Sequence, residues 1–145
     1  MSIAAYGIGR EVALAFAEAE RRVREALAEE GFGVLTEIDV QATLQKKIDV
    51  AIPRYTILGA CNPRFAHQAI LAEPDIGLLL PCNVVLRELG DGRTVIEALD
   101  PVRQLELTGN PAITPLAAEV RERLARAVER AAGVTDAAAG QPGSP

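Results

Sequence analysis

Two short segments with the same Cys-Asn order hold most of the chemically reactive side chains of this sequence. Cys61 and Cys82 lie 21 residues apart, and His67 is the single histidine of the chain. A deprotonated thiol is both a nucleophile and a soft metal ligand, so these segments are where we expect a ligand to bind. The candidate ligand-binding residues are Cys61, Asn62, Pro63, His67, Pro81, Cys82 and Asn83.

The first segment has the sequence of a helix start. Asn62 suits the N-cap position, and Pro63 suits the first helical position. The thiol of Cys61 would then lie beside the positive end of the helix dipole, which lowers a cysteine pKa below its usual value. A capping residue followed by proline also occurs at Asp100 and Thr114, where there is no cysteine. The pattern is therefore equally consistent with a plain helix start.

These residue types are not diagnostic of catalysis. Free cysteine is among the residue types most often buried, and we favour inert packing over reactivity for Cys61 and Cys82. For His67 we expect a half-buried, hydrogen-bonded side chain. The sequence has no CxxC or HxxxH spacing, so we predict no metal site, whereas a reversible redox pair of the two thiols stays open. Because no complete set of acid, base and nucleophile is present, we lean against an enzyme and assign no catalytic residue and no cofactor.

Size and charge exclude several functional classes. A chain of 145 residues fits one compact domain. Its 15 basic and 20 acidic residues leave a net charge of -5, and it has no Trp, so we exclude nucleic acid as a partner. Apolar runs such as residues 76–80 are far shorter than the ~20 residues that span a bilayer, and residues 1–10 lack the pattern of a secretory signal. We expect a cytoplasmic protein without membrane contact.

Apolar periodicity predicts the elements that position the cysteine segments. Two long amphipathic helices are predicted over residues 11–30 and 115–132, and Gly31 ends the first of them. Asp39 and Asp100 are predicted to cap short helices, Thr114 to cap the second long helix, and a further short helix follows Pro63. Strands are predicted over residues 4–8, 34–39, 55–60, 84–89 and 94–99, and the last two form a hairpin.

This order of elements predicts an α+β fold. We expect a single, mainly antiparallel sheet of about five strands, covered by two long helices and accompanied by short ones. Residues 1–132 form one domain in this interpretation. Residues 133–145, rich in Gly, Ala and Pro, are predicted to be a disordered tail.

Several segments resemble the domain-of-unknown-function 302 family, DUF302. The resemblance is carried by residues 30–40, by residues 57–63 with Ala66 and His67, by residues 79–84 and by residues 100–101. It implies a small prokaryotic α+β protein whose sheet is β-α-β-rich and TATA-binding-protein-like, and which pairs as a homodimer. It also directs attention to the two Cys-Asn segments, where this sequence shows no departure from the family pattern. The family has no settled activity.

Two functional hypotheses follow. The first is a non-catalytic homodimeric module that binds a ligand or partner and associates through an exposed apolar patch. The alternative is a thiol-dependent redox, sulfur-handling or metal-binding site built on Cys61 and Cys82. The expected partners are a second copy of the chain and a small-molecule ligand.

Overall fold

The protein is a five-stranded antiparallel sheet with helices packed against it, which confirms the predicted α+β class. The computed structural model describes residues 3–133. The strands lie in the order β1-β5-β4-β3-β2, and each neighbouring pair is antiparallel. Their bounds are β1 (Gly7–Val12), β2 (Gly33–Asp39), β3 (Tyr55–Cys61), β4 (Cys82–Gly90) and β5 (Arg93–Leu99).

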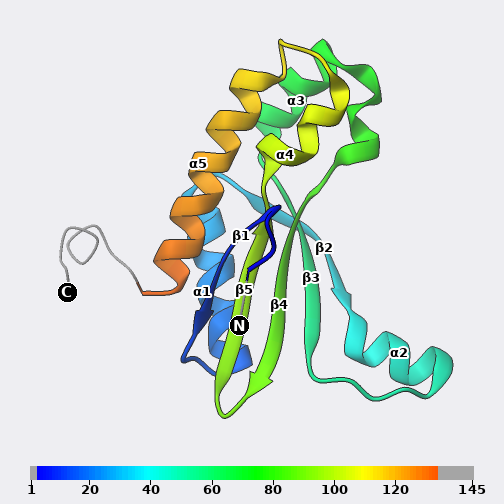
Figure 1. The fold of residues 1–145 in the computed structure, drawn as a ribbon, viewed down its shortest axis with the longest axis vertical. Helices are drawn as coiled ribbons and strands as arrows, with labels where there is room; N and C mark the ends of the chain where they lie inside the picture. Colours follow the sequence, from blue (N-terminus) through cyan, green and yellow to red (C-terminus); the bar gives the residue numbers. More distant parts are fainter. Residues whose placement is uncertain (1–2, 134–145) are drawn as a thin grey trace.

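Two long helices lie together on one face of the sheet, the short helices over residues 63–72 and 101–105 lie beyond one of its ends, and the short helix over residues 40–48 projects near the opposite end (Figure 1). The helices are α1 (Phe16–Glu29), α2 (Val40–Ile48), α3 (Pro63–Ala72), α4 (Pro101–Leu105) and α5 (Thr114–Ala131). Two 3-10 turns, η1 (Pro74–Leu79) and η2 (Glu106–Thr108), complete the chain path. Helices α3 and α4 lie at the end of the sheet where β3 stops and β4 begins.

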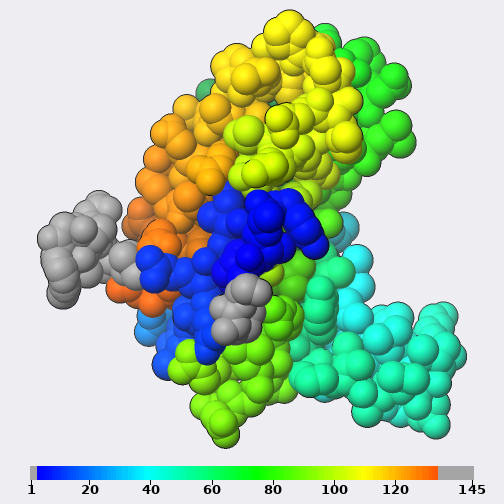
Figure 2. Space-filling model, in the orientation of Figure 1, coloured from blue at the N-terminus to red at the C-terminus, as the bar shows by residue number. Residues whose placement is uncertain are grey.

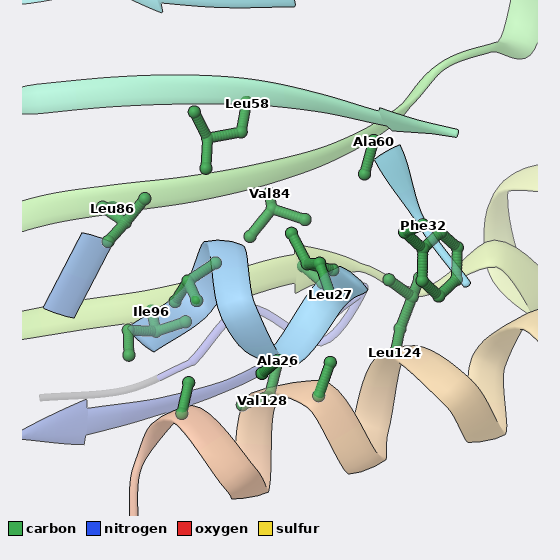
Figure 3. Packing of buried hydrophobic residues seen from close by; sticks show 14 of the residues in the cluster. Ala26, Leu27, Phe32, Leu58, Ala60, Val84, Leu86, Ile96, Leu124 and Val128 are labelled. Carbon is green, nitrogen blue, oxygen red and sulfur yellow. The ribbon is translucent and has the colours of Figure 1, made fainter. Parts of the chain in front are cut away.

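The main core lies between the sheet and the paired helices α1 and α5. Figure 3 shows side chains from both helices pointing toward side chains from the strands. The buried residues of this core are at most 7% exposed, and burial of one large apolar side chain contributes about 1.5–3 kcal/mol. They include Leu27, Leu124 and Val128 from the helices and Leu58, Leu86 and Ile96 from the strands.

A second, smaller hydrophobic cluster lies beyond the end of the sheet. Ala69 of α3, Ile76 of η1 and Ile113 before α5 are buried there against one another. The cluster fixes the short helices to the beginning of α5. The molecule therefore has two packed regions, which meet at the end of the sheet.

The prediction for the N-terminal residues was wrong in its boundaries. The strand is β1 (Gly7–Val12) rather than residues 4–8, and α1 begins at Phe16 rather than at residue 11. Val12 stands four residues before Phe16 and so continues the helical spacing, but it pairs with Thr94 in the sheet. Val12 and Phe16 are buried in the same core from two different elements, which is why the spacing was misleading.

The predicted end of α1 is confirmed. Gly31 adopts a positive φ of 87°, and its N–H donates to the carbonyl of Ala28 at 3.1 Å. The N–H of Phe32 donates to the carbonyl of Leu27 at 2.9 Å, so the two bonds form a Schellman motif. A residue with a Cβ would be strained at this φ.

Of the predicted caps at Asp39, Asp100 and Thr114, the first two are confirmed. The side chains of Asp39 and Asp100 each accept a backbone N–H at 2.9 Å at the beginning of α2 and α4. Thr114 does not cap α5, because it is already the first helical residue and the N-cap position is taken by Ile113. Ile113 is 1% exposed, and its packing in the second cluster places the helix start.

The β2 side of the molecule projects away from the two packed regions. Strand β2 is an edge strand, and α2 extends beyond the body of the molecule (Figure 2). None of the α2 residues is buried. Within residues 3–133 no helix is long and apolar enough to cross a membrane. Of the predicted tail, residues 134–145 lie outside the described part of the chain.

Candidate functional site

The tertiary structure brings the two cysteines to one end of the sheet. Cys61 is the last residue of β3, and Cys82 is the first residue of β4. The two strands are neighbours, and Ala60 stands directly opposite Cys82. Both cysteines are half-buried and both are free thiols. Both cysteines therefore lie at the ends of strands, as the strands predicted over residues 55–60 and 84–89 indicate.

Both cysteines line an apolar pocket of about 290 Å³. One wall comes from the end of the sheet and the loops next to it, and the opposite wall comes from α3, α4, α5 and Leu80. The sheet side consists of Phe32, Leu35, Thr36, Ala60, Cys61, Asn62, Pro81 and Cys82. The other side consists of Phe65, Ala66, Ala69, Leu80, Leu105, Leu116 and Val120. We refer to this cavity as the apolar pocket.

The apolar pocket lies where the two hydrophobic clusters meet. Ala60 and Val120 belong to the main core, whereas Ala69 belongs to the second cluster. Three alanines, at positions 60, 66 and 69, stand in its wall, so the two clusters approach each other without filling the space between them. Protein interiors are otherwise packed with few voids larger than a water molecule. An apolar space of this size is close to the lower limit of ligand pockets, about 300 Å³.

Gly59 allows the strands under the pocket to come close together. A Cβ at this position would be 2.9 Å from Cγ of Pro81 and would clash with the hydroxyl of Thr36. Thr36 and Pro81 both line the pocket. Glycine is required here because the neighbouring side chains occupy the space in which a side chain would stand.

Three of the seven predicted residues lie outside the apolar pocket. His67 is exposed on α3, whereas the pocket is lined by Phe65, Ala66 and Ala69 of that helix. The expected half-buried, hydrogen-bonded histidine is wrong, and within residues 3–133 His67 has no hydrogen-bond partner. Asn83 is exposed as well, because it follows Cys82 in β4 and successive strand residues point to opposite faces.

Pro63, the third of these residues, lines a neighbouring groove. This groove also contains Asn62, Arg64, Phe65, Gln68 and Arg123, next to Gly31. Asn62 and Phe65 are shared with the apolar pocket, so the two spaces are adjacent. The guanidinium of Arg123 lies over the Phe65 ring, 5.5 Å from its centre. We refer to this second space as the arginine groove.

Asn62 occupies the N-cap position of α3, but its side chain does not cap the helix. Its Nδ2 donates to the carbonyl of Glu30 at 3.5 Å, and Nη1 of Arg123 donates to the same carbonyl at 3.3 Å. Carbonyls in the last turn of a helix have no partner within the helix, and Glu30 ends α1. Asn62 therefore fastens α3 to α1, and the predicted side-chain cap is wrong.

The environment of Cys82 disfavours its thiolate. Burial is the main cause, and the charge of Cys61 adds to it, so the pKa of Cys82 is raised from its ordinary value of 9.0 to about 11. Cys82 is therefore protonated at neutral pH. Among residues 3–133 there is no group of three or more His, Cys, Asp or Glu side chains that could hold a metal ion.

Prediction from the sequence did not find the residues that form most of the pocket wall. Leu105, Leu116 and Val120 belong to α4 and α5, far from the Cys-Asn segments along the chain. In the sequence, Leu116 and Val120 are distinguished only as members of the apolar stripe of the helix predicted over residues 115–132. The signal that could have indicated these residues is the apolar stripe of α5, because it continues at spacings of four beyond the end of the sheet to Leu116 and Val120.

The family model described as domain of unknown function DUF302 matches residues 8–131. The chain belongs to the DUF302 family. A crystal structure of an uncharacterized conserved DUF302 protein from Bacillus stearothermophilus is similar to it, with 30% sequence identity and a TM-score of 0.81. The match covers 88% of this chain and 99% of that chain. No curated protein is significantly similar. The resemblance stated from the Cys-Asn segments is thus confirmed.

Proposed function

We propose that this DUF302 domain is a non-catalytic binding protein that holds a small apolar ligand in the apolar pocket. The observation that carries the proposal is the unfilled space of about 290 Å³ between the two hydrophobic clusters. Contact with water is unfavourable for apolar walls, so a ligand that displaces water from this space gains binding free energy. The cytoplasm remains the proposed compartment, since free thiols persist in a reducing environment.

The direct test is a fluorescence titration with the neutral apolar dye N-phenyl-1-naphthylamine. We expect saturable binding to the wild-type protein. Ala66→Leu and Ala66→Phe add progressively larger side chains to the pocket wall, so affinity should fall in that order. Thermal unfolding should show that both variants stay folded, because the added atoms enter empty space.

Ala118→Phe is the matched control. Ala118 is exposed on α5 and lines none of the spaces described above, so the same phenyl group should leave dye binding unchanged. Absence of dye binding to the wild-type protein would contradict the proposal. So would equal affinity of the wild type and the Ala66→Phe variant.

We further propose that the domain acts as a homodimer. The support is the projecting side of the molecule, where Leu35 and Ile38 of edge strand β2 are 69% and 49% exposed. Ile48 of α2 is 63% exposed, and Val50 beside it is 42% exposed. Neighbouring exposed apolar side chains on an unpaired edge are typical of association sites.

A thiol-dependent function is the second candidate, because both cysteines face the same pocket. Since the pKa of Cys82 is raised to about 11, chemistry at neutral pH would begin at Cys61. Cys82 would then take part as a protonated thiol or as the second partner of a redox pair. Alkylation of the two cysteines, considered in the Discussion, tests this candidate.

A further inference from the structure

We infer that the ligand is a small amphipathic anion, whose apolar body occupies the apolar pocket and whose carboxylate lies in the arginine groove. This inference rests on the proposed binding function and adds the chemical class of the ligand. The two spaces adjoin at Asn62 and Phe65, which line both of them. One molecule can therefore contact both.

The same two helices supply apolar groups to one space and cationic groups to the other. On α5, Leu116 and Val120 face the apolar pocket, and Arg123, three residues further on, faces the groove. On α3, Ala66 faces the pocket, whereas Arg64 faces the groove. The lining thus changes from apolar to cationic over about one helical turn on each helix.

Arg64 is the cation that is available to a ligand. Within residues 3–133 it has no hydrogen-bond or ion-pair partner, and it is exposed. It lies in the first turn of α3, which contains no acidic residue. An anion in the groove would meet a guanidinium whose planar donor pattern matches a carboxylate.

Arg123 is already engaged by protein groups. Its Nε donates to Glu119 at 3.2 Å, and it also donates to the Glu30 carbonyl. These contacts hold its guanidinium over Phe65, at the boundary between pocket and groove. Arg123 is therefore held in place by protein contacts and can offer a ligand only its remaining N–H donors. Arg64 contributes the unpaired charge that selects an anion.

The test compares octanoate with octanol, which carry similar apolar chains and differ in charge at pH 7.5. Each compound is titrated against protein with bound N-phenyl-1-naphthylamine, and dye displacement gives its inhibition constant. We expect octanoate to bind up to about fivefold more tightly, the upper range for a solvent-exposed ion pair. The preference should shrink as salt concentration rises, because exposed charges are screened.

Arg64→Gln should abolish the preference for octanoate without changing the affinity for the neutral dye. Arg103→Gln is the control, since Arg103 is an exposed arginine of α4 that lines neither space. It removes the same charge and should retain the preference.

Tighter binding of octanol to the wild type, or an unchanged preference in Arg64→Gln, would overturn the inference while dye binding still supports the proposed function. If the dye does not bind at all, the proposed function fails first.

Discussion

At the scale of single residues, the two cysteines line the same pocket but lie at opposite ends of their strands. Cys82 lies opposite Ala60 at the start of β4, whereas Cys61 ends β3. Burial removes water from the Cys82 thiolate, and a negative charge on Cys61 would repel it, so the pKa of Cys82 is raised to about 11. A buried and protonated thiol is a poor nucleophile at neutral pH.

This environment predicts the pH dependence of alkylation. Cys82 should react with iodoacetamide slowly at pH 7 and increasingly up to pH 11, measured by peptide mass spectrometry on the folded protein. Cys61→Ser removes the smaller of the two causes, so the apparent pKa of Cys82 should fall but stay above 9.0, because burial persists. An apparent pKa of Cys82 below 9.0 in the wild type would contradict this account.

Gly59 supports a second prediction at the residue scale. Gly59→Ala should lower the free energy of unfolding, because the added methyl group would meet Thr36 and lie 2.9 Å from Pro81 Cγ. Gly33→Ala on β2 is the control, since a Cβ there would meet nothing within 4 Å. Urea denaturation should show the larger loss of unfolding free energy for Gly59→Ala. In the double variant, Thr36→Ala should recover part of this loss, because it removes the hydroxyl that the added methyl group meets. Equal stability of the two glycine variants would count against a close approach at this position.

At the scale of elements, the end of α1 joins three helices. Glu30 is 6% exposed, and its carboxylate pairs with Arg126 of α5 at 3.0 Å. A carboxylate at the C-terminal end of a helix is disfavoured by the helix dipole, and the α5 arginines offset this effect. The carbonyl of the same residue accepts from Asn62 and Arg123. The junction thus connects the pocket wall on α3 to the main core.

The junction predicts unequal effects of two neighbouring substitutions. Glu30→Gln should lower the free energy of unfolding by about 1–3 kcal/mol, because the partly buried hydrogen bonds between the Glu30 carboxylate and the half-exposed Arg126 are weakened. Glu29→Gln removes the exposed pair between Glu29 and Arg130, in which both side chains are at least half exposed, and should cost less than about 1 kcal/mol. Urea denaturation measures both. A larger loss for Glu29→Gln would show that the Glu30 contacts do not hold the helices together.

At the scale of the whole molecule, the fold consists of a sheet-and-helix core, a second cluster beyond the sheet end, and a projecting side. The pocket forms where the first two meet, and the proposed dimer uses the third. The projecting side also carries Lys46 and Lys47, the two lysines of a chain whose net charge is -5. The surface proposed for association shares Leu35 with the pocket wall, whereas Ile38, Ile48 and Val50 lie outside the pocket.

Because Ile48 lies outside the pocket, we expect that association can be removed without loss of the pocket. Wild-type protein should sediment at about twice 15.4 kDa at micromolar concentration, and Ile48→Glu should sediment as a monomer that still binds the apolar dye. Leu107→Glu is the matched control, because Leu107 is 77% exposed but lies on η2. A monomeric wild-type protein at these concentrations would contradict the proposed homodimer.

The sequence was sufficient for the class of fold and for most of the elements. The stripes of α1 and α5, the β4–β5 hairpin, the glycine that ends α1 and the caps at Asp39 and Asp100 all rest on residues within a few positions of one another. Such local signals are readable without knowing the fold. Local signals were misleading at Val12 and Phe16, which keep a helical spacing of four although they belong to a strand and a helix. They also missed the start of α5, which is determined by the burial of Ile113.

The pocket was decided by the tertiary structure. That Cys61 and Cys82 share a wall depends on the adjacency of β3 and β4, and the opposite wall comes from α5, more than thirty residues further along the chain. Arg64 and Phe65 are adjacent in the sequence, but only the tertiary structure brings Arg123 into the same groove. Local periodicity specifies which face of an element is buried, whereas the volume left between two clusters depends on how distant side chains pack together.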